Sequence, residues 1–366
     1  MINESDIEDV WDDEEQEAEV AEASDVPVER LRMIIEKRQE PIRIDKYLVA
    51  RIEGGTRNKV QQAIDDGYVL VNNEVVKANY KIKPGDNIVL FETRKPESQE
   101  IIPENIPLNI IYEDDDLLVV NKPAGMVVHP ACGNYSGTLV NGLSYYLQQE
   151  KVDIENLSRV GLVHRIDKDT TGLVVIGKKD KAMNLLAAQF KKHTVHRRYI
   201  ALVWGDLEED EGTIEAHIGR NQRFRKIMDT FPEGDYGKEA ITHYKVLERF
   251  NYVTLVELRL ETGRTHQIRV HMKYIGHPLF SDGTYGGDRI LKGTVFTRYK
   301  QFIDNCFEIL PRQALHAKEL GFTHPTTGEW LQFDSEIPDD LKQVIEKWRS
   351  YTGGMTKQLR QKLDNI

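Results

Sequence analysis

The side chains of this chain that could do chemistry concentrate in residues 161–177, GLVHRIDKDTTGLVVIG. Apolar runs at residues 162–163 and 173–176 have the composition of short buried strands, and they bracket a polar loop. The loop contains five polar residues, His164, Arg165, Asp167, Lys168 and Asp169. A carboxylate beside an arginine, without a nearby cysteine or glycine-rich phosphate loop, indicates a nucleophile or base rather than a metal or nucleotide site.

Two other interpretations of this loop compete with a catalytic one. Asp and Thr beside Gly also form ordinary turns, in which their side chains bond to the local backbone. Protein kinases have a catalytic loop that begins with His and Arg, but Asp comes third there, whereas Ile166 intervenes here. Because no glycine-rich loop or Asp-Phe-Gly segment accompanies it, we discard the kinase interpretation and leave the turn open.

The charge of the chain is distributed unevenly. Residues 1–30 contain 13 of the 60 acidic residues but only one of the 49 basic ones. The remaining 47 acidic and 48 basic residues give the rest of the chain a net charge of +1, although the whole chain has −11. The overall acidity therefore does not exclude a nucleic-acid partner. The acidic start is poor in large apolar residues, so we predict a disordered tail over residues 1–38.

Length and composition bound the organisation and the compartment. A chain of 366 residues with 40% hydrophobic content can bury one large core and a smaller module, so we expect two domains. There are two cysteines, Cys132 and Cys306, no apolar run near 18 residues and no apolar signal segment. We therefore expect a soluble protein of the cytoplasm with no membrane partner.

The predicted small module covers residues 39–93. Ile44, Tyr47 and Leu48 have helical spacing, and Thr56 could cap a second helix that buries Val60, Ala63 and Ile64. A hairpin about residues 72–73 and a last strand at residues 87–91 follow. Basic residues cluster on the helical part and could be no more than a solvated face: Arg43, Lys46, Arg51, Arg57 and Lys59.

Three segments of the module, residues 43–48, 56–61 and 66–72, resemble the alpha-L RNA-binding motif. The resemblance implies that the module binds the phosphate backbone of structured RNA through its cations. The residues that would make these contacts are Arg43, Lys46, Arg57 and Lys59. Residues 94–107, with three prolines, are expected to link the module to a larger body at residues 108–350.

Apolar periodicity predicts the elements of the body. We expect strands at residues 110–112, 117–120, 195–203, 239–248 and 253–260, and helices at residues 138–149, 180–192 and 338–351. The alternation in residues 195–203 places Tyr199 inward, either as a core residue or as the lining of a pocket, because a buried phenol needs a hydrogen-bond partner. After the last helix we expect a polar tail at residues 351–366, and its part after Gly353-Gly354 could be a short helix or disordered.

A second dense polar stretch occupies residues 261–272, where a strand end passes through Gly263 into a helix that Thr265 could cap. His266 and His271 are five residues apart and do not share a helix face, so we do not expect a zinc pair. Arg264 and Arg269 remain as candidates to bind an anion.

Six spaced motifs over about residues 110–341 resemble those of the pseudouridine synthases of large-subunit ribosomal RNA, and among them the D-type enzymes. They are VNKPAG at 120–125, HRIDKDTTG at 164–172, YIALVWG at 199–205, TGRTHQIRVHM at 262–272, GHPL at 276–279 and QALHA at 313–317. The resemblance implies an α+β fold, with a mixed, mainly antiparallel sheet and flanking helices behind the small N-terminal module. It also implies an isomerisation that uses no metal, redox or nucleotide cofactor.

The resemblance assigns roles to particular residues. Asp167 would be the nucleophile, with Ile166 replacing the family's commoner Leu, and Arg269 would pair with it bidentately and keep it ionised. Tyr199 would stack on the uracil of an everted uridine, and Arg165 would occupy the space that the uridine leaves. Ile268 would line the uracil pocket, and Arg264 would contact phosphate. The basic segment 218–228 would face RNA or form a solvated hairpin.

The expected partner is large-subunit ribosomal RNA or a precursor ribosomal particle, bound by a monomer. A catalytically silent RNA-binding assembly factor and a synthase acting on another RNA are the alternatives. A hydrolase using His164 and Asp167 would need a metal, serine or cysteine that the sequence does not identify.

Overall fold

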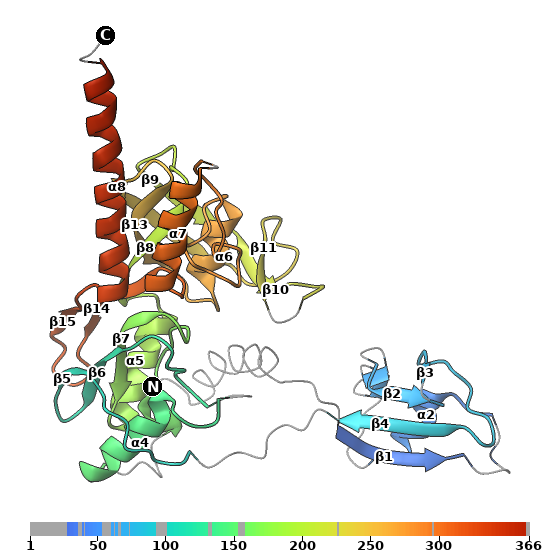
Figure 1. The fold of residues 1–366 in the computed structure, drawn as a ribbon. Coiled ribbons are helices and arrows are strands. Elements are labelled where there is room, and N and C mark those ends of the chain that lie inside the picture. The colour runs from blue at the N-terminus through green and yellow to red at the C-terminus, as the bar shows by residue number, and fades with distance from the viewer. Residues whose placement is uncertain are drawn as a thin grey trace. The chain divides into compact units, whose positions relative to one another are not determined.

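The structure is a computed structural model, shown in Figure 1. It describes residues 28–35, 39, 41–52, 60–61, 63–64, 67–72, 74–92, 101–130, 134–152, 158–224, 227–294 and 296–363. The chain divides into two compact units between Glu100 and Ile101. Within the described residues, no helix combines the length and the apolar composition that crossing a bilayer requires.

The N-terminal unit contains a sheet and a short helix over one apolar core. Its elements are β1 (Val28–Ile34), α2 (Ile44–Val49), β2 (Val69–Val71), β3 (Glu74–Val75) and β4 (Asn87–Glu92), with the strand order β1-β4-β2-β3. Ile44 and Leu48 of α2 are fully buried, as their spacing predicted, and they share the core with Val60 and Ile64. The predicted hairpin is confirmed, and Asn72 adopts the left-handed conformation, with φ 54°, that its turn requires.

Strand β1 corrects the predicted extent of the acidic tail. Its residues pair antiparallel with β4, and Ile35 directly after it is buried. Leu31 and Met33 alternate with exposed neighbours and lie against the core of the unit. The tail prediction for residues 28–35 is wrong because this alternation gives the segment an apolar face despite its charges. Residues 1–27 lie outside the described part.

The body is built on one large sheet, which in the described residues has the order β5-β6-β7-β14-β8-β13-β12-β9, with β15 also paired to β14. The strands are β5 (Ile110–Glu113), β6 (Leu117–Lys122), β7 (Thr171–Gly177), β8 (His196–Trp204), β9 (Glu211–Glu215), β12 (Ile241–Arg249), β13 (Val253–Leu260), β14 (Leu315–Thr323) and β15 (Trp330–Asp334). β7 and β14 pair in parallel, and the other neighbours pair antiparallel. The predicted mixed, mainly antiparallel sheet is therefore confirmed.

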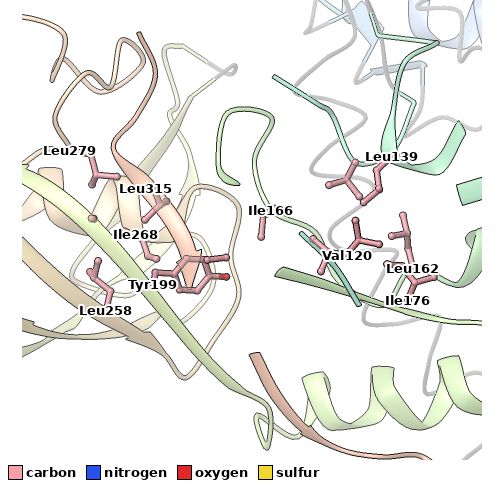
Figure 2. Close-up of a cluster of buried hydrophobic side chains, with 14 of the residues drawn as sticks. Val120, Leu139, Leu162, Ile166, Ile176, Tyr199, Leu258, Ile268, Leu279 and Leu315 are labelled. Carbon is pink, nitrogen blue, oxygen red and sulfur yellow. The ribbon is translucent and has the colours of Figure 1, made fainter. Parts of the chain in front are cut away.

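Helices cover both faces of this sheet. They are α4 (Leu139–Gln149), α5 (Asp180–Lys191), α6 (Gln267–Tyr274), α7 (Thr297–Ile309) and α8 (Asp339–Leu363), with a short 3-10 helix η1 (Ser158–Gly161). Tyr199 and Ala201 of β8 point into the cluster beneath α4 and α6, whereas Ile200 and Leu202 point into the cluster beneath α7 and α8. In Figure 2, Ile166 lies between two groups of side chains of the first cluster, one that includes Tyr199 and Ile268 and another that includes Val120 and Ile176.

Three sequence predictions about the body need correction. Residues 101–107 were predicted as linker but lie against α4, where the Ile102 carbonyl accepts from the Asn141 side chain and the Glu104 N–H donates to the Asn141 carbonyl. Residues 162–163 form no strand beyond one bridge, Leu162 to Ile176, because the next contact with β7 is made by the His164 side chain and not by backbone. Helix α8 continues through Gly353 to Leu363, since two helical glycines cost only about 1 kcal/mol each and no proline follows.

A separate hairpin projects from the body. Its strands β10 (His217–Arg220) and β11 (Met228–Phe231) pair with each other. Near its turn, Phe224 is 58% exposed, and the Arg223 guanidinium lies 5.2 Å from its ring centre. The hairpin that the sequence analysis gave as one of two alternatives is thus present, with an aromatic and a cation displayed to solvent.

Candidate active site

A cavity of about 350 Å³ lies where the loop before β7, strand β8 and the turn into α6 meet. All six site residues predicted in the body line it: Arg165, Asp167, Tyr199, Arg264, Ile268 and Arg269. Its size is that of a pocket for a small molecule or a single nucleotide. The structure thus gathers side chains that are more than 100 positions apart in the sequence.

The loop that contains Asp167 is held along the open edge of β7. Nε2 of His164 accepts a hydrogen bond of 3.0 Å from the Val175 backbone N–H, and the imidazole stacks on Phe190 with 4.5 Å between ring centres. Burial, reinforced by the charge of Arg197, lowers the pKa of His164 to about 3, so the ring is neutral and can accept. The imidazole therefore takes the place of a neighbouring strand's carbonyl.

A buried lysine anchors the other end of the loop. Nζ of Lys122 donates to the carbonyls of Pro123, Met126 and Lys168 at 2.9, 2.8 and 2.9 Å. Lys122 is completely buried, and burial lowers its pKa to about 7 against the opposing charges of Asp167 and Asp169. Because Lys168 directly follows Asp167, Lys122 connects the loop after β6 to the backbone beside the Asp167 carboxylate.

The turn interpretation of the loop is partly right. The Thr170 N–H donates to the Asp167 carbonyl at 3.0 Å, so the backbone does turn here. The Asp167 carboxylate instead accepts from Arg269 of α6, Nη1 to Oδ2 at 2.9 Å. Gly172 lets β7 start directly after the turn, because its φ is 121° and a Cβ would overlap the Ala317 carbonyl. The turn and the polar site therefore coexist.

Arg269 bridges two carboxylates, and this corrects the predicted pairing. Its Nε and Nη2 donate to Oδ2 and Oδ1 of Asp282 at 2.7 and 2.9 Å, and only Nη1 reaches Asp167. The bidentate partner is thus Asp282, not Asp167. Asp282 is completely buried, and the backbone N–H groups of Thr284 and Tyr285 also donate to it. Asp282 therefore aims the guanidinium at Asp167.

These contacts set the charges of the site. Burial alone would raise the pKa of Asp167, but the nearby His266 in its protonated form, the charge of Arg269 and the Arg269 hydrogen bond hold it below its usual range. Burial also opposes the charge on Arg269, yet the hydrogen bonds to Asp282 and the charges of both carboxylates raise its pKa. Asp167 is consequently an ionised carboxylate beside a permanent cation in a largely buried site.

Helix α6 begins in a way that the sequence did not predict. Its N-cap is His266, whose φ of 56° is left-handed and whose side chain makes no cap bond, so the predicted Thr265 cap is wrong. The Gln267 amide orders the turn instead. Its oxygen accepts from Thr262 Oγ1 and the Arg264 N–H at 2.9 Å each, and its nitrogen donates to the Ile241 carbonyl.

Tyr199 and Ile268 form an apolar wall of the cavity. They are 8% and 4% exposed, and both belong to the cluster drawn in Figure 2. Burial raises the pKa of Tyr199, so its hydroxyl keeps its proton at neutral pH. Arg165 is exposed at the cavity, and Arg264 donates from Nε to the Glu239 carbonyl at 3.0 Å.

The predicted RNA-binding residues of the small module belong to the other unit. Arg43 forms a bidentate pair with Asp45, Nε to Oδ1 at 3.0 Å and Nη2 to Oδ2 at 2.8 Å. Lys46 is exposed on α2. Arg57 and Lys59 lie outside the described residues.

Sequence reasoning missed four residues that shape the site: Lys122, His266, Asp282 and Tyr285. His266 was weighed only as a metal ligand, and Asp282 before Gly283 looks like an ordinary turn. A signal was available for Lys122, a lysine at the end of an otherwise apolar strand. Among the described residues, no three His, Cys, Asp or Glu side chains gather as metal ligands would.

Comparison with known proteins gives two family matches. Residues 116–274 match the family described as RNA pseudouridylate synthase, and residues 42–88 match the S4 domain. The first match contains Asp167, Tyr199 and Arg269, and the second contains Arg43, Lys46, Arg57 and Lys59.

Individual proteins are similar over most of their length. A protein of Chlorobaculum parvum described as an uncharacterized RNA pseudouridine synthase is 48% identical, over 86% of this chain and 97% of its own. The ribosomal large subunit pseudouridine synthase D of Vibrio parahaemolyticus is 40% identical, over 85% of this chain and 92% of its own. The structure of human RNA pseudouridylate synthase domain containing 4 superposes with a TM-score of 0.51 at 23% identity, over 66% of this chain and 93% of its own.

Proposed function

Since this chain belongs to the RNA pseudouridylate synthase family, we propose that it converts specific uridines of large-subunit ribosomal RNA to pseudouridine. The observation that supports this most directly is the ionised Asp167, held by Arg269 in a cavity that Tyr199 also lines. The named activity of the Vibrio relative supports the choice of RNA.

The reaction is an isomerisation. The bond between ribose C1′ and uracil N1 breaks, the freed uracil turns, and a bond from C1′ to C5 forms. The ring loses the proton at C5 and gains one at N1, so the composition does not change and no redox partner is required. Such a reaction needs a carboxylate beside the sugar and ring, as nucleophile or as stabiliser of developing charge.

We assign the carboxylate role to Asp167. Arg269 supports it by keeping the carboxylate ionised, and its single hydrogen bond to Oδ2 leaves Oδ1 toward the cavity. Tyr199 presents a phenol ring that could stack on a uracil and relay the C5 proton, passing on its own hydroxyl hydrogen as it takes that proton up. Ile268 supplies an apolar wall.

The rim of the cavity suits a uridine that has left its base stack. Extruding a base costs a few kcal/mol, which a side chain entering the vacated space helps to offset. We propose Arg165 for that role, because it is exposed and lies two residues before Asp167. Arg264 would contact a phosphate near the cavity.

We propose that the N-terminal unit binds structured RNA and so delivers the substrate. The S4 match and the cations Arg43 and Lys46 of α2 support this. Arg57 and Lys59 are proposed to contribute from the same match. We place the protein in the cytoplasm, since ribosomal RNA is its proposed substrate. We also propose that it acts as a monomer.

The test is pseudouridine mapping of ribosomal RNA from a strain that lacks this protein, complemented with variants. Wild type and Asp169→Asn, a matched change two residues away, should restore the missing pseudouridines, whereas Asp167→Asn should restore none. Full restoration by Asp167→Asn would overturn the assignment of Asp167. Restored ribosome assembly without any pseudouridine, in cells with wild-type protein, would favour the assembly-factor alternative.

A further inference from the structure

His266 is a buried histidine that faces the Asp167 carboxylate, and the mechanism above does not use it. Its Nε2 lies 3.9 Å from Asp167 Oδ1, the oxygen that does not bind Arg269. The residue adopts a left-handed backbone conformation, with φ 56°, immediately before α6. A non-glycine residue in this conformation is uncommon, and here it turns the imidazole into the cavity.

The other ring nitrogen of His266 is engaged by Tyr285. Nδ1 lies 2.8 Å from the Tyr285 hydroxyl, and the two rings meet edge to face. Tyr285 is 5% exposed, and the Arg269 guanidinium lies 5.1 Å from its ring centre. Burial raises the pKa of Tyr285, so its hydroxyl keeps its proton.

Counting hydrogens around the Tyr285 oxygen indicates the direction of these bonds. The Met228 backbone N–H can only donate, and it donates to the Tyr285 oxygen at 3.1 Å. The single hydroxyl hydrogen of Tyr285 then finds its acceptor in Nδ1 of His266, the other hydrogen-bond contact of this oxygen among the described residues. If Nδ1 donated instead, that hydrogen would have no acceptor there. A neutral imidazole that accepts at Nδ1 must have its hydrogen on Nε2, so the N–H points toward Asp167.

The neutral form is the one that the surroundings favour. Burial and the charges of Arg269 and Arg165 lower the pKa of His266, whereas the charges of Asp167 and Asp282 oppose this. Burial is the larger effect, so the pKa of His266 lies below its usual range and the ring is uncharged at neutral pH.

We propose that His266 is a positioning residue for Asp167: Tyr285 fixes the tautomer with the hydrogen on Nε2, and this N–H donates to Oδ1 once RNA fills the cavity. This inference rests on the proposed function. The present 3.9 Å is too long for a hydrogen bond, but catalytic contacts are often long before substrate binds and shorten in the complex. With Arg269 on Oδ2 and His266 on Oδ1, the carboxylate plane would be fixed against the ribose.

Nitrogen NMR of the full-length protein labelled with ¹⁵N in histidine tests the tautomer without reference to activity. The signals of His266 are those that disappear in His266→Asn, a change that tolerates the left-handed backbone. At pH 7.5 the wild type should show an unprotonated Nδ1 and a protonated Nε2, and Tyr285→Phe should abolish this preference. A hydrogen on Nδ1 or a doubly protonated ring in the wild type would overturn the inference even if the enzyme is active.

Single-turnover kinetics on ribosomal RNA tests the consequence. We expect His266→Asn to lower the rate of pseudouridine formation by about 10- to 100-fold, and Tyr285→Phe by about 3- to 10-fold, with RNA affinity unchanged. The double variant should be no slower than His266→Asn, because Tyr285 acts through His266. Additive losses, or a loss in affinity alone, would contradict the proposal.

Tyr274→Phe is the matched control, because Tyr274 is a 47% exposed tyrosine on α6. It should leave both the spectrum and the rate unchanged. If His266→Asn does not fold, His266→Gln assigns the signals in its place, and the wild-type tautomer and the effect of Tyr285→Phe still decide the question. If no variant and no wild-type preparation forms pseudouridine, the proposed function fails while the NMR result stands.

Discussion

Each of the two units contains a bidentate arginine–aspartate ion pair, but the two pairs differ in burial and in proposed role. In the N-terminal unit, Arg43 pairs bidentately with Asp45, and in the body Arg269 pairs bidentately with Asp282. Both carboxylates are completely buried, but the Arg43 side chain is 38% exposed and the Arg269 side chain only 6%. The exposed guanidinium remains accessible to a phosphate, whereas the buried one is committed to the carboxylates of Asp282 and Asp167.

The difference shows how burial separates binding from chemistry. A buried charge needs partners for nearly all its hydrogen-bonding groups, and Arg269 finds them in Asp282 and Asp167. Such a group is fixed in direction and can aim a carboxylate. An exposed charge is screened by salt and contributes little individually, so several are needed to bind RNA.

The strongest test of this contrast is Asp282→Asn. Losing one partner of a buried charge pair should misdirect Arg269, and we expect the rate of pseudouridine formation to fall about 10²-fold with little change in RNA affinity. Single-turnover rates and filter binding on the same RNA would measure this. Asp288→Asn, the same change at an exposed aspartate, should have no effect. An equal loss in both variants would contradict the role of Asp282.

Removing residues 1–100 tests whether the N-terminal unit contributes to RNA binding but not to the chemistry of the body. The units have separate cores, so the body should fold and keep its chemistry. We expect RNA binding to weaken at least about tenfold, and the rate at saturating RNA to change less than about threefold. Circular dichroism and saturation kinetics would check this. A truncated body that does not fold would refute the division into two units.

His164→Phe should weaken the loop while keeping the stack on Phe190. We expect the free energy of unfolding to fall by about 1–3 kcal/mol at pH 7.5, because the buried Val175 N–H loses its acceptor. The folded pKa of His164, about 3, lies below the unfolded value near 6.5, so the unfolded chain binds the extra proton. The stability that this site contributes is therefore complete above about pH 6.5 and is lost as the pH falls toward 3.

Urea unfolding between pH 7.5 and 5 checks this prediction. The difference in the free energy of unfolding between wild type and His164→Phe should shrink with falling pH, by up to about 1.4 kcal/mol per pH unit. Parallel curves would mean that His164 does not titrate in this way.

The smallest effect is expected from Lys46→Ala. Because Lys46 is exposed on α2, its removal should weaken RNA binding by only about two- to threefold and make the salt dependence slightly shallower. Titrations at several salt concentrations would measure both. Lys77→Ala, an exposed lysine of the same unit outside α2, should change less. A loss of RNA affinity for Lys46→Ala as large as the loss of rate expected for Asp282→Asn would contradict the distinction between the two units.

Much of the fold could be predicted because apolar periodicity reports which face of an element is buried. The helical spacing of Ile44 and Leu48 and the alternation around Tyr199 both identified the inward face. Failures occurred where charge masked a short alternation, as in β1, or where a loop followed a strand edge without joining it, as at Leu162.

The chain itself determined which residue types stand in the site, since the motifs around Asp167, Tyr199 and Arg269 are visible in the sequence alone. Only the tertiary structure decided how they are connected. Asp282 orients Arg269, and His266 faces Asp167, because strands, turns and helices far apart in sequence meet at one cavity. A side chain's partner depends on distance and on exclusion from water, and neither is encoded in local spacing.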